Sequence, residues 1–403
     1  MTTERRYFTL NDKLRAAPGA AAPRRGKGLR ITLMLLSILL VLLLLAWLIF
    51  PHVMNPDRLV RFFRYMGLRE KENYGRVTFE AAAGNVYAGF DDGLLVGTET
   101  GLTLYALDGE QKAFVQGSLP TPVLRTGGEV SLVFSPGSSY AAAIGAGGDI
   151  LLDGALSGAL LDASVSFDGY SVRLTAESGS KAVAEVLNPK QEAIYRFSSR
   201  TRYLNACAVS EKGEWLAVAS LEEERSIYRS AVVLLRTDRP VADLEQEDSG
   251  AVRAELGNRV IYELRFLDES HLLAVTQDEL VFLDLKGELL STLPLEGERL
   301  VDYAVSREGW LLLALEGGGA ARVLSLDASG NILARLDLAD RVRSVSAEGR
   351  YGAVLTEMEL RILDSRLEEY DRSWDVLGAT RVVVRADGTA LLIAAGGTKL
   401  FIP

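Results

Sequence analysis

The sequence has 403 residues, of which 48% are hydrophobic and 24% are charged, so it has enough apolar side chains for one large core and is not a disordered chain. Its 54 acidic residues outnumber its 44 basic residues, which gives a net charge of −10. Residues 75–403 alone carry 31 basic and 49 acidic residues, and an excess of 18 negative charges argues against nucleic acid as a partner.

The first fifty residues predict a membrane anchor. Residues 1–30 carry eight basic and two acidic residues without apolar periodicity, which is typical of a disordered tail. Ile31–Phe50 is a run of twenty residues without a charge, long enough as a helix to cross a hydrocarbon core of about 30 Å. A cleaved secretory signal is the alternative, but its apolar part would be shorter and would end in small residues, whereas AWLIFPHVM at 46–54 is bulky.

We therefore expect a single transmembrane helix at 31–50 that acts as an uncleaved signal-anchor. Basic flanks stay in the cytoplasm, so the N-terminus is expected to be cytoplasmic and the C-terminal domain extracytoplasmic. Residues 51–74 are expected to form a juxtamembrane helix or stalk, since Asn55 suits an N-cap and Pro56 suits the first helical turn. Two alternatives stay open for this helix: it lies on the membrane surface, or it packs under the domain.

From Arg76 onward, short apolar runs alternate with turns that contain Gly, Asp, Ser or Asn, and no apolar period of helix length occurs. This pattern predicts an all-β domain over residues 75–403. One phrase recurs, for instance as AVSEKGEWLAVAS at 208–220 and AVSREGWLLLALE at 304–316. The turn positions of this phrase are Gly93, Gly128, Gly169, Gly213, Gly309, Gly349 and Gly388, with Ser270 in the one wide gap.

These turns recur at intervals of mostly 35 to 44 residues, which is typical of a β-propeller with four strands per blade. In each unit, the phrase up to its serine predicts the innermost strand, and the apolar run after the turn predicts a second strand buried between blades. The turns predict eight blades; seven is the alternative if residues 121–197 form one distorted blade. The chain stops at Pro403 without a last outer strand, so we predict that RVTFEAAA from Arg76 supplies it and closes the ring.

Four further features are interpreted structurally. Leu221–Asn258 lengthens one blade, and DLEQEDSGAVRAE at 243–255 inside it is interpreted as a solvated acidic loop. Trp215 and Trp310 are expected to be wedges between blades rather than binding residues. Cys207 is the single cysteine, which excludes an internal disulfide, and we expect it to be a buried strand residue because nothing nearby would ionise it.

The segment DDGLLVGTETGLTLYALDGE at 91–110 resembles the strand–turn–strand unit of the quinoprotein-type propellers, which include the pyrroloquinoline-quinone alcohol dehydrogenases and an outer-membrane assembly lipoprotein. The whole layout from about Arg30, with its NPD stretch at Asn55–Tyr65, resembles an uncharacterised family of single-span, membrane-anchored β-propeller proteins of Firmicute bacteria. That family has no assigned activity, so the resemblance implies fold and location alone. A quinone cofactor is not expected, because one cysteine cannot form an adjacent-cysteine pair and no clear calcium-ligand set is seen.

The motifs that could carry chemistry are weak. His52 and His271 have no second ligand at metal-binding spacing, and FDDGLL at 90–95 lacks the alternating oxygen ligands of a calcium loop. IGAGGDILL at 144–152 runs into a strand rather than a helix, so it offers no helix N-terminus to an anion. SWDV at 373–376 occurs once, whereas a repeat signature would recur. We therefore predict no metal, no cofactor and no catalytic residue.

The sequence thus favours a non-enzymatic, membrane-anchored propeller that binds a protein partner in the bacterial cell envelope. Loops at one end of the ring, including the insertion Leu221–Asn258, are the expected contact surface. The alternative is a glycan or small-molecule sensor or hydrolase that uses carboxylates near the central channel. The partner, the ligand and the oligomeric state do not follow from the sequence.

Overall fold

The computed structural model describes residues 33–38, 40–41, 61, 63–65, 75–224, 227–239, 251–376 and 378–403. The chain divides into two compact units, Met1–Arg64 and Tyr65–Pro403. In the first unit, residues 33–38 and 40–41 are helical, while the rest of the predicted span 31–50, the tail 1–30 and His52 lie outside the described residues. Within the part of the chain that the structure describes, no helix is long and apolar enough to cross a membrane.

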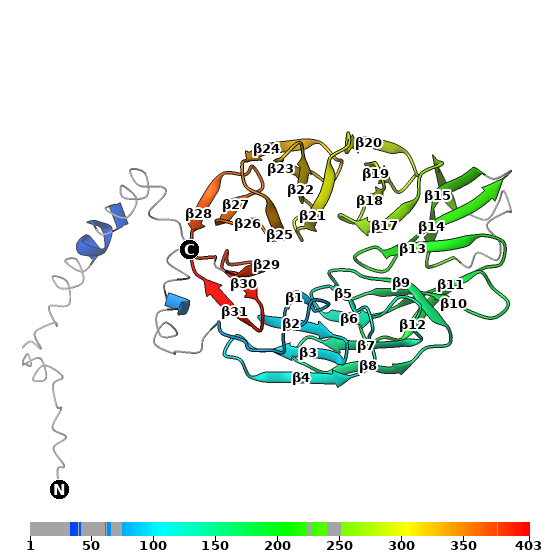
Figure 1. The fold of residues 1–403 in the computed structure, drawn as a ribbon, viewed down its shortest axis with the longest axis horizontal. Coiled ribbons are helices and arrows are strands. Elements are labelled where there is room, and N and C mark those ends of the chain that lie inside the picture. The colour runs from blue at the N-terminus through cyan, green and yellow to red at the C-terminus, as the bar shows by residue number, and fades with distance from the viewer. Residues whose placement is uncertain are drawn as a thin grey trace, which may run out of the picture. The chain divides into compact units, whose positions relative to one another are not determined.

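The second unit is a ring of eight sheets around a common axis (Figure 1), and each sheet is one blade of a β-propeller. Strands pair antiparallel with their sequence neighbours throughout. Blades 1 to 4 consist of β1 (Val86–Phe90), β2 (Gly93–Thr98), β3 (Gly101–Tyr105) and β4 (Gln111–Gln116); β5 (Val123–Thr126), β6 (Val130–Phe134), β7 (Tyr140–Gly145) and β8 (Ile150–Ala155); β9 (Ala159–Val165), β10 (Ser171–Ala176), β11 (Ala182–Leu187) and β12 (Ala193–Ser199); β13 (Tyr203–Val209), β14 (Trp215–Glu224), β15 (Ile227–Arg236) and β16 (Val252–Gly257).

Blades 5 to 8 consist of β17 (Ile261–Phe266), β18 (His271–Thr276), β19 (Glu279–Asp284) and β20 (Leu289–Pro294); β21 (Arg299–Val305), β22 (Leu311–Gly317), β23 (Ala320–Leu326) and β24 (Ile332–Leu338); β25 (Val342–Glu348), β26 (Tyr351–Thr356), β27 (Leu360–Asp364) and β28 (Glu369–Ser373); β29 (Ala379–Val384), β30 (Ala390–Ala394) and β31 (Gly397–Phe401). Residues 121–197 therefore form parts of separate sheets, and the expectation of eight blades is confirmed over the alternative of seven.

The burial of each strand follows its place in the blade. All the residues of β6 and β26 are buried, because a second strand has a neighbouring blade on both sides. Outer strands alternate instead: β4 and β12 bury every second residue, since one of their faces meets solvent. This difference explains why the second strands read as continuous apolar runs in the sequence.

The recurring turn lies between the first and second strands of every blade, as predicted. Gly169 and Gly213 have φ angles of 83° and 71°, a left-handed conformation that glycine adopts without a steric penalty. The buried serine before each of these glycines accepts a hydrogen bond from the backbone beyond the turn, from Tyr170 N to Ser166 Oγ at 3.1 Å and from Trp215 N to Ser210 Oγ at 3.0 Å. We call the side of the ring that carries these turns the first-turn face, and the opposite side the second-turn face.

The predicted closure of the ring is confirmed, in a shorter form than a full strand. Thr78 forms an antiparallel bridge with Gly397 of β31, the last strand of the three-stranded blade 8. Thr398 N donates to Val77 O at 2.9 Å, and Phe79 N donates to Gly396 O at 3.2 Å. Val77 is fully buried, so the segment also contributes its side chain to the core between blades 8 and 1.

Tyr65 is the first residue of the second unit and anchors to blade 8. Its hydroxyl donates to Asp387 Oδ2 at 2.7 Å and accepts from Arg385 Nη1 at 3.1 Å, both in the β29–β30 turn. Burial and the hydrogen bond to Asp387 raise the pKa of Tyr65 to about 12. Of the predicted helix at 51–74, residues 61 and 63–65 are helical and the other residues up to 74 lie outside the described residues. The choice between a membrane-lying helix and a stalk stays open.

The two tryptophans sit between blades. Trp310 is 4% exposed, packs with Val345 and Ala347 of blade 7, and donates from Nε1 to Gly349 O at 2.8 Å. Trp215 is half-buried against the core between blades 4 and 5, with the Arg236 guanidinium 5.5 Å from its ring. Both are wedges, as predicted.

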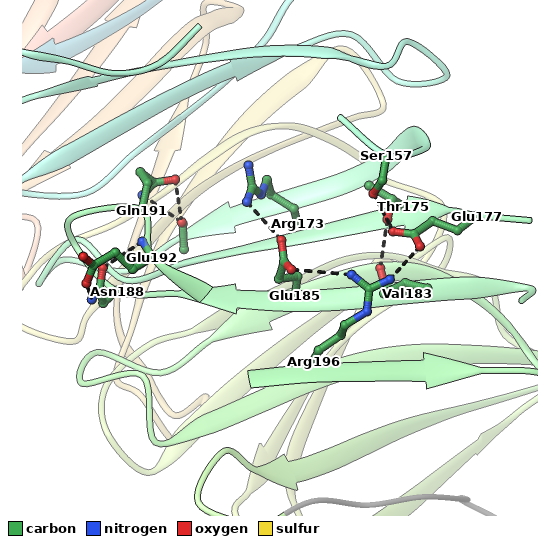
Figure 2. Close-up of polar contacts among 11 residues, drawn as sticks. Ser157, Arg173, Thr175, Glu177, Val183, Glu185, Asn188, Gln191, Glu192 and Arg196 are labelled. Atoms are coloured by element: carbon green, nitrogen blue, oxygen red, sulfur yellow. Dashed lines mark hydrogen bonds and ion pairs between the residues drawn. The ribbon is translucent and has the colours of Figure 1, made fainter. Parts of the chain in front are cut away.

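Blade 3 buries charge on the face that points away from blade 4. Val172 and Leu174 of β10 pack toward blade 4, so Arg173 between them points to the opposite side. Figure 2 shows Glu185 of β11 between two guanidinium groups, 3.0 Å from Arg173 and 3.5 Å from Arg196. Burial lowers the pKa of Arg173, and the Glu185 carboxylate offsets part of that cost.

The long insertion Leu221–Asn258 belongs to blade 4. The strands β14 and β15 have ten residues each, whereas the second and third strands of the other blades have five to seven. Residues 240–250 lie outside the described residues. The interpretation of 243–255 as one acidic loop is wrong at its end: Val252–Gly257 is the outer strand β16, because Ala254 and Leu256 alternate with polar residues and are buried.

Replacing the wedge Trp310 tests how blades 6 and 7 are held together. Trp310→Ala should lower the free energy of unfolding by about 3–5 kcal/mol, since it leaves a cavity and removes the hydrogen bond to Gly349. Urea unfolding followed by circular dichroism measures the change. The control is Trp374→Ala at a residue that is 66% exposed, where a change within about 0.5 kcal/mol is expected. Equal effects of the two variants would contradict the wedge assignment.

Candidate functional site

The candidate site is a cavity of about 740 Å³ at the centre of the ring, which we call the cup. Its walls are the innermost strands of the blades, and its lining includes the turns of the first-turn face, such as Asp91–Asp92 and Gly127–Gly128. Because these turn residues are at the surface, the cup reaches solvent on the first-turn face. Its volume is in the range of small-molecule sites.

The innermost strands need hydrogen-bond partners on the edge that faces the cup, because no further strand pairs there. Side chains from the preceding blade supply some of them. Asp162 of blade 3 accepts from Cys207 N of blade 4 at 3.0 Å, and Asp302 of blade 6 accepts from Val345 N of blade 7 at 3.0 Å. We call these interactions inter-blade edge contacts.

The same contacts occur with donor side chains. Arg125 Nε of blade 2 donates to Ala163 O of blade 3 at 3.2 Å, and Arg343 Nη1 of blade 7 donates to Ala379 O of blade 8 at 2.7 Å. Each contact reaches from one blade to the next along the chain. The polar residues of the inner strands therefore join blades as well as line the cup.

Arg125 also crosses the ring. Its Nη2 atom lies 3.4 Å from Glu263 Oε1 of blade 5 and 3.8 Å from Asp162 Oδ1 of blade 3. Glu263 pairs in turn with Arg265 Nε at 3.1 Å. Burial acts to raise the pKa of Glu263, but the two guanidinium groups outweigh it and hold this pKa below its usual value. Arg125 and Arg265 of this cluster line the cup.

Two more groups of the innermost strands have shifted pKa values. Burial raises the pKa of Asp302 against the opposing effects of Val345 N and of Arg381, whose Nη1 lies 3.6 Å from Asp302 Oδ2. Burial and the nearby Glu263 carboxylate raise the pKa of Tyr303. Asp302 and Tyr303 both line the cup.

The mouth of the cup is acidic. Arg307 of blade 6 approaches Asp168 of blade 3 across the mouth at 3.6 Å. Burial, then the nearby Asp168 and Glu269, raise the pKa of Glu211, and burial followed by Glu308 raises that of Glu348 against the effect of Arg307. Glu211 and Glu348 thus lie at the mouth of the cup together with Arg307.

The histidine His271 joins blades 5 and 6. Its Nδ1 lies 2.8 Å from Asp268 Oδ2, and its Nε2 lies 3.3 Å from Ser329 Oγ. The order of groups is that of a serine-hydrolase triad, but the amides of Ser329 and Asn331 both donate to Asp327 in their own turn. These amides cannot stabilise an oxyanion, and we assign the cluster a structural role. No metal-binding group of His, Cys, Asp and Glu occurs among the described residues.

The remaining segments singled out in the sequence lie in strands and turns of the propeller. Cys207 is a buried residue of β13, as predicted, and burial raises its thiol pKa well above the usual value. The glycines of 144–152 lie in the β7–β8 hairpin and run into the strand β8, as expected, and Asp91 and Asp92 form the β1–β2 turn. Ser373 ends β28, and the Trp374 that follows it is exposed.

The sequence reasoning missed the charged residues of the cup. Arg125, Glu263, Arg265, Asp302 and Arg381 all lie in innermost strands. The sequence did contain a signal for these residues. A charged residue that interrupts the apolar phrase a few positions before its turn cannot face the apolar core between blades, so it indicates a side chain that faces the centre of the ring. A single repeat does not reveal which charges meet across the ring, because Arg125 and Glu263 come from blades three positions apart.

Comparisons with known proteins give a family and a fold. Residues 64–298 match the model of a family described as "Family of unknown function (DUF5711)". No curated protein matches the sequence significantly.

Among solved structures, the chain is similar to the β-propeller domain of Cps50 (Swd1) from Myceliophteria thermophila, with 9% identity, a TM-score of 0.46, and coverage of 71% of this chain and 94% of the other. It is also similar to apo AztD from Citrobacter koseri, with 13% identity, a TM-score of 0.47, and coverage of 78% and 89%. A third similar structure is a eukaryotic initiation factor, with 12% identity, a TM-score of 0.47, and coverage of 81% and 90%.

Removing the Glu263 carboxylate should destabilise the ring. Glu263→Gln leaves Arg125 and Arg265 without their shared partner, and we expect a loss of about 2–4 kcal/mol in the free energy of unfolding. Urea unfolding measures it. Asp337→Asn removes a solvent-exposed partner of Arg335 and should cost less than about 1 kcal/mol. A Glu263→Gln variant as stable as the wild type would show that the crossing contact does not hold the blades.

The raised pKa of Asp302 gives a pH dependence with a defined sign. The folded protein binds a proton at Asp302 more readily than the unfolded chain, so this group favours folding below its unfolded pKa and loses that contribution as pH rises through the folded pKa. The wild type should therefore gain stability relative to Asp302→Asn as the pH falls from 7 toward 4. Urea midpoints of both proteins at several pH values test this; a wild type that does not gain stability relative to Asp302→Asn as the pH falls would disprove it.

Proposed function

We propose a function from the propeller itself, because this chain belongs to the DUF5711 family of unknown function. The proposal is that it is a non-enzymatic protein-interaction scaffold of the bacterial cell envelope. In this proposal residues 31–50 anchor it in the cell membrane, with the N-terminus in the cytoplasm and the propeller outside. The fold is compatible with such a role but does not by itself establish it.

The membrane part of the proposal is supported by the sequence. Ile31–Phe50 has no charge over twenty residues, and the eight basic residues before it favour a cytoplasmic N-terminus. The likeness to quinoprotein-type propellers stays a prediction.

The observation that carries the scaffold proposal is the long hairpin of blade 4. The hairpin of β14 and β15 is longer than the neighbouring strand β13. Tyr203, the first residue of β13, pairs with Leu221, but β14 and β15 continue to pair with each other beyond that point, for example at Glu223 and Tyr228. The hairpin therefore extends beyond the other strands of its blade on the second-turn face. Such a projecting element is accessible to a partner.

The surface around this hairpin carries exposed tyrosines. Tyr203, Tyr228 and Tyr262 are each more than half exposed, and they lie at the second-turn ends of blades 4 and 5. The Lys181 ammonium contacts Tyr203: its Nζ lies 2.8 Å from the tyrosine hydroxyl and 4.3 Å from the centre of the ring. Tyrosine is enriched among the residues that dominate binding energy at protein interfaces. We call these three side chains with the hairpin the tyrosine surface.

The test places a photo-crosslinking phenylalanine analogue at single positions of the full-length protein in intact cells. With the analogue at Tyr228 or Tyr262, irradiation should produce one discrete adduct with an envelope protein. With the analogue at Phe114 or Ile150, which are exposed on outer strands of blades 1 and 2, no such adduct is expected.

A second variant separates recognition from folding. Tyr228→Ala should reduce the yield of the adduct formed at position 262 by at least fivefold, while the urea midpoint stays unchanged because the side chain is 54% exposed. Adducts of equal yield at all four positions, or none at 228 and 262, would refute the tyrosine surface as the contact site.

A further inference from the structure

The outer strand of blade 5, β20, lies on the outer rim of the ring next to β24 of blade 6 (Figure 1). One edge of β20 pairs with β19, and no strand that the structure describes pairs with its other edge. A free edge presents backbone N–H and C=O groups that can pair with a strand of another chain. Proteins commonly protect such an edge with charged side chains.

The strand β20 lacks this protection, because its sequence LLSTLP contains no charged residue. Every other outer strand that the structure describes has at least one. The charged residues are Lys112 in β4, Asp153 in β8, Arg196 in β12, Arg253 and Glu255 in β16, Arg335 and Asp337 in β24, and Glu369, Asp371 and Arg372 in β28. Among these strands, β20 is therefore the one whose edge is open to pairing with another chain.

The surface beside this edge is apolar. Four aliphatic side chains at the beginnings of β20 and β24 are exposed, namely Leu289 at 59%, Leu290 at 40%, Ile332 at 54% and Leu333 at 46%. Ser291 Oγ of β20 donates to Ser329 O at 2.7 Å in the turn before β24, so the two strands begin next to each other. We call β20 together with Ile332 and Leu333 the apolar edge. Covering it would remove apolar surface from water.

The backbone of Thr292 faces outward from the blade. Leu295 N donates to Asp278 O at 2.8 Å, so the backbone groups of Leu295 face the β19 side. These groups alternate in direction along a strand, so those of Thr292 and Pro294 face the outer rim. Pro294 has no N–H and occupies a position where the blade itself needs none. Thr292 thus offers both a donor and an acceptor to an incoming strand, and Pro294 offers an acceptor alone.

We propose that β20 pairs antiparallel with β20 of a second copy of this chain, about a two-fold axis at Thr292. In this register the two copies of Thr292 lie opposite each other and exchange N–H···O bonds, and Leu290 lies opposite Pro294 of the second copy. No like charges meet, because the strand has no charge.

A second copy matches the apolar edge better than an unrelated strand does. It brings an edge that is equally uncharged, together with the same exposed aliphatic side chains, so the apolar area of each copy covers that of the other. The proposal goes beyond the scaffold function and does not rest on it, since it uses no residue of the tyrosine surface.

The first test is oxidative crosslinking of the purified full-length Thr292→Cys variant in detergent. Hydrogen-bonded residues opposite each other in an antiparallel pair have Cα atoms about 5.5 Å apart, a distance that a disulfide spans. Oxidation with copper phenanthroline should give a dimer on a non-reducing gel, and a reducing agent should reverse it. The wild type should give no dimer, because its single cysteine Cys207 is buried.

The matched control is Phe114→Cys in blade 1. Phe114 is exposed, and its place in β4 is equivalent to that of Thr292 in β20, two residues after the residue that follows the register shift. Since β4 carries Lys112, we expect at least tenfold less dimer from this variant. Equal yields from the two variants would show random collision and would overturn the proposal, as would the absence of dimer from Thr292→Cys.

The second test measures the number of protein chains per particle by light scattering of the full-length protein in detergent. The wild type and Phe114→Lys should contain two chains, whereas Thr292→Lys should contain one, because it places two ammonium groups opposite each other at the two-fold axis. The urea midpoint of Thr292→Lys should equal that of the wild type, since Thr292 is exposed. A wild type with one chain would overturn the proposal. Two chains in Thr292→Lys would show that another part of the protein joins the copies, and would overturn it as well.

Discussion

The structure depends on one constraint: every blade carries apolar side chains on both faces, and each face must be covered by a neighbour. The fully buried strands β6 and β26 show that the second strand of a blade is enclosed on both sides. A linear row of such sheets would leave an apolar face at each end. Closing the row into a ring is the arrangement that covers all of them, and the short bridge between Thr78 and Gly397 completes it.

Closure creates a second problem at the centre, where eight inner strands present an unpaired edge to the cup. The inter-blade edge contacts address it with side chains, and this explains why charged residues occupy strands that otherwise pack apolar cores. Asp162 both accepts from Cys207 N and lies near Arg125, so one carboxylate satisfies a backbone amide and an ion pair. The charge pattern of the cup is thus partly a result of building the ring.

Local features of the fold could be predicted from the sequence, because they repeat. The turn glycines, the serine before them and the apolar second strand obey the same steric and burial rules in each blade, and the missing last strand pointed to the segment after Arg76. Contacts between blades far apart in sequence could not be predicted, because they occur once. The pair Arg125–Glu263 depends on the curvature of the ring and on the tilt of two strands, neither of which a repeat encodes. The alternation that marks β16 was hidden by the acidic residues before it.

The bridge that closes the ring also sets an order in time. Val77 and Thr398 are 321 residues apart, so the first residues of the domain leave the ribosome long before their partners exist. Blades 1 to 7 can form as the chain is made, but the core between blades 8 and 1 forms only after β29, β30 and β31 have been made. Until then the face of blade 1 that packs against blade 8 is exposed to solvent. A nascent chain in this state is vulnerable to proteases and to association with other unfinished chains.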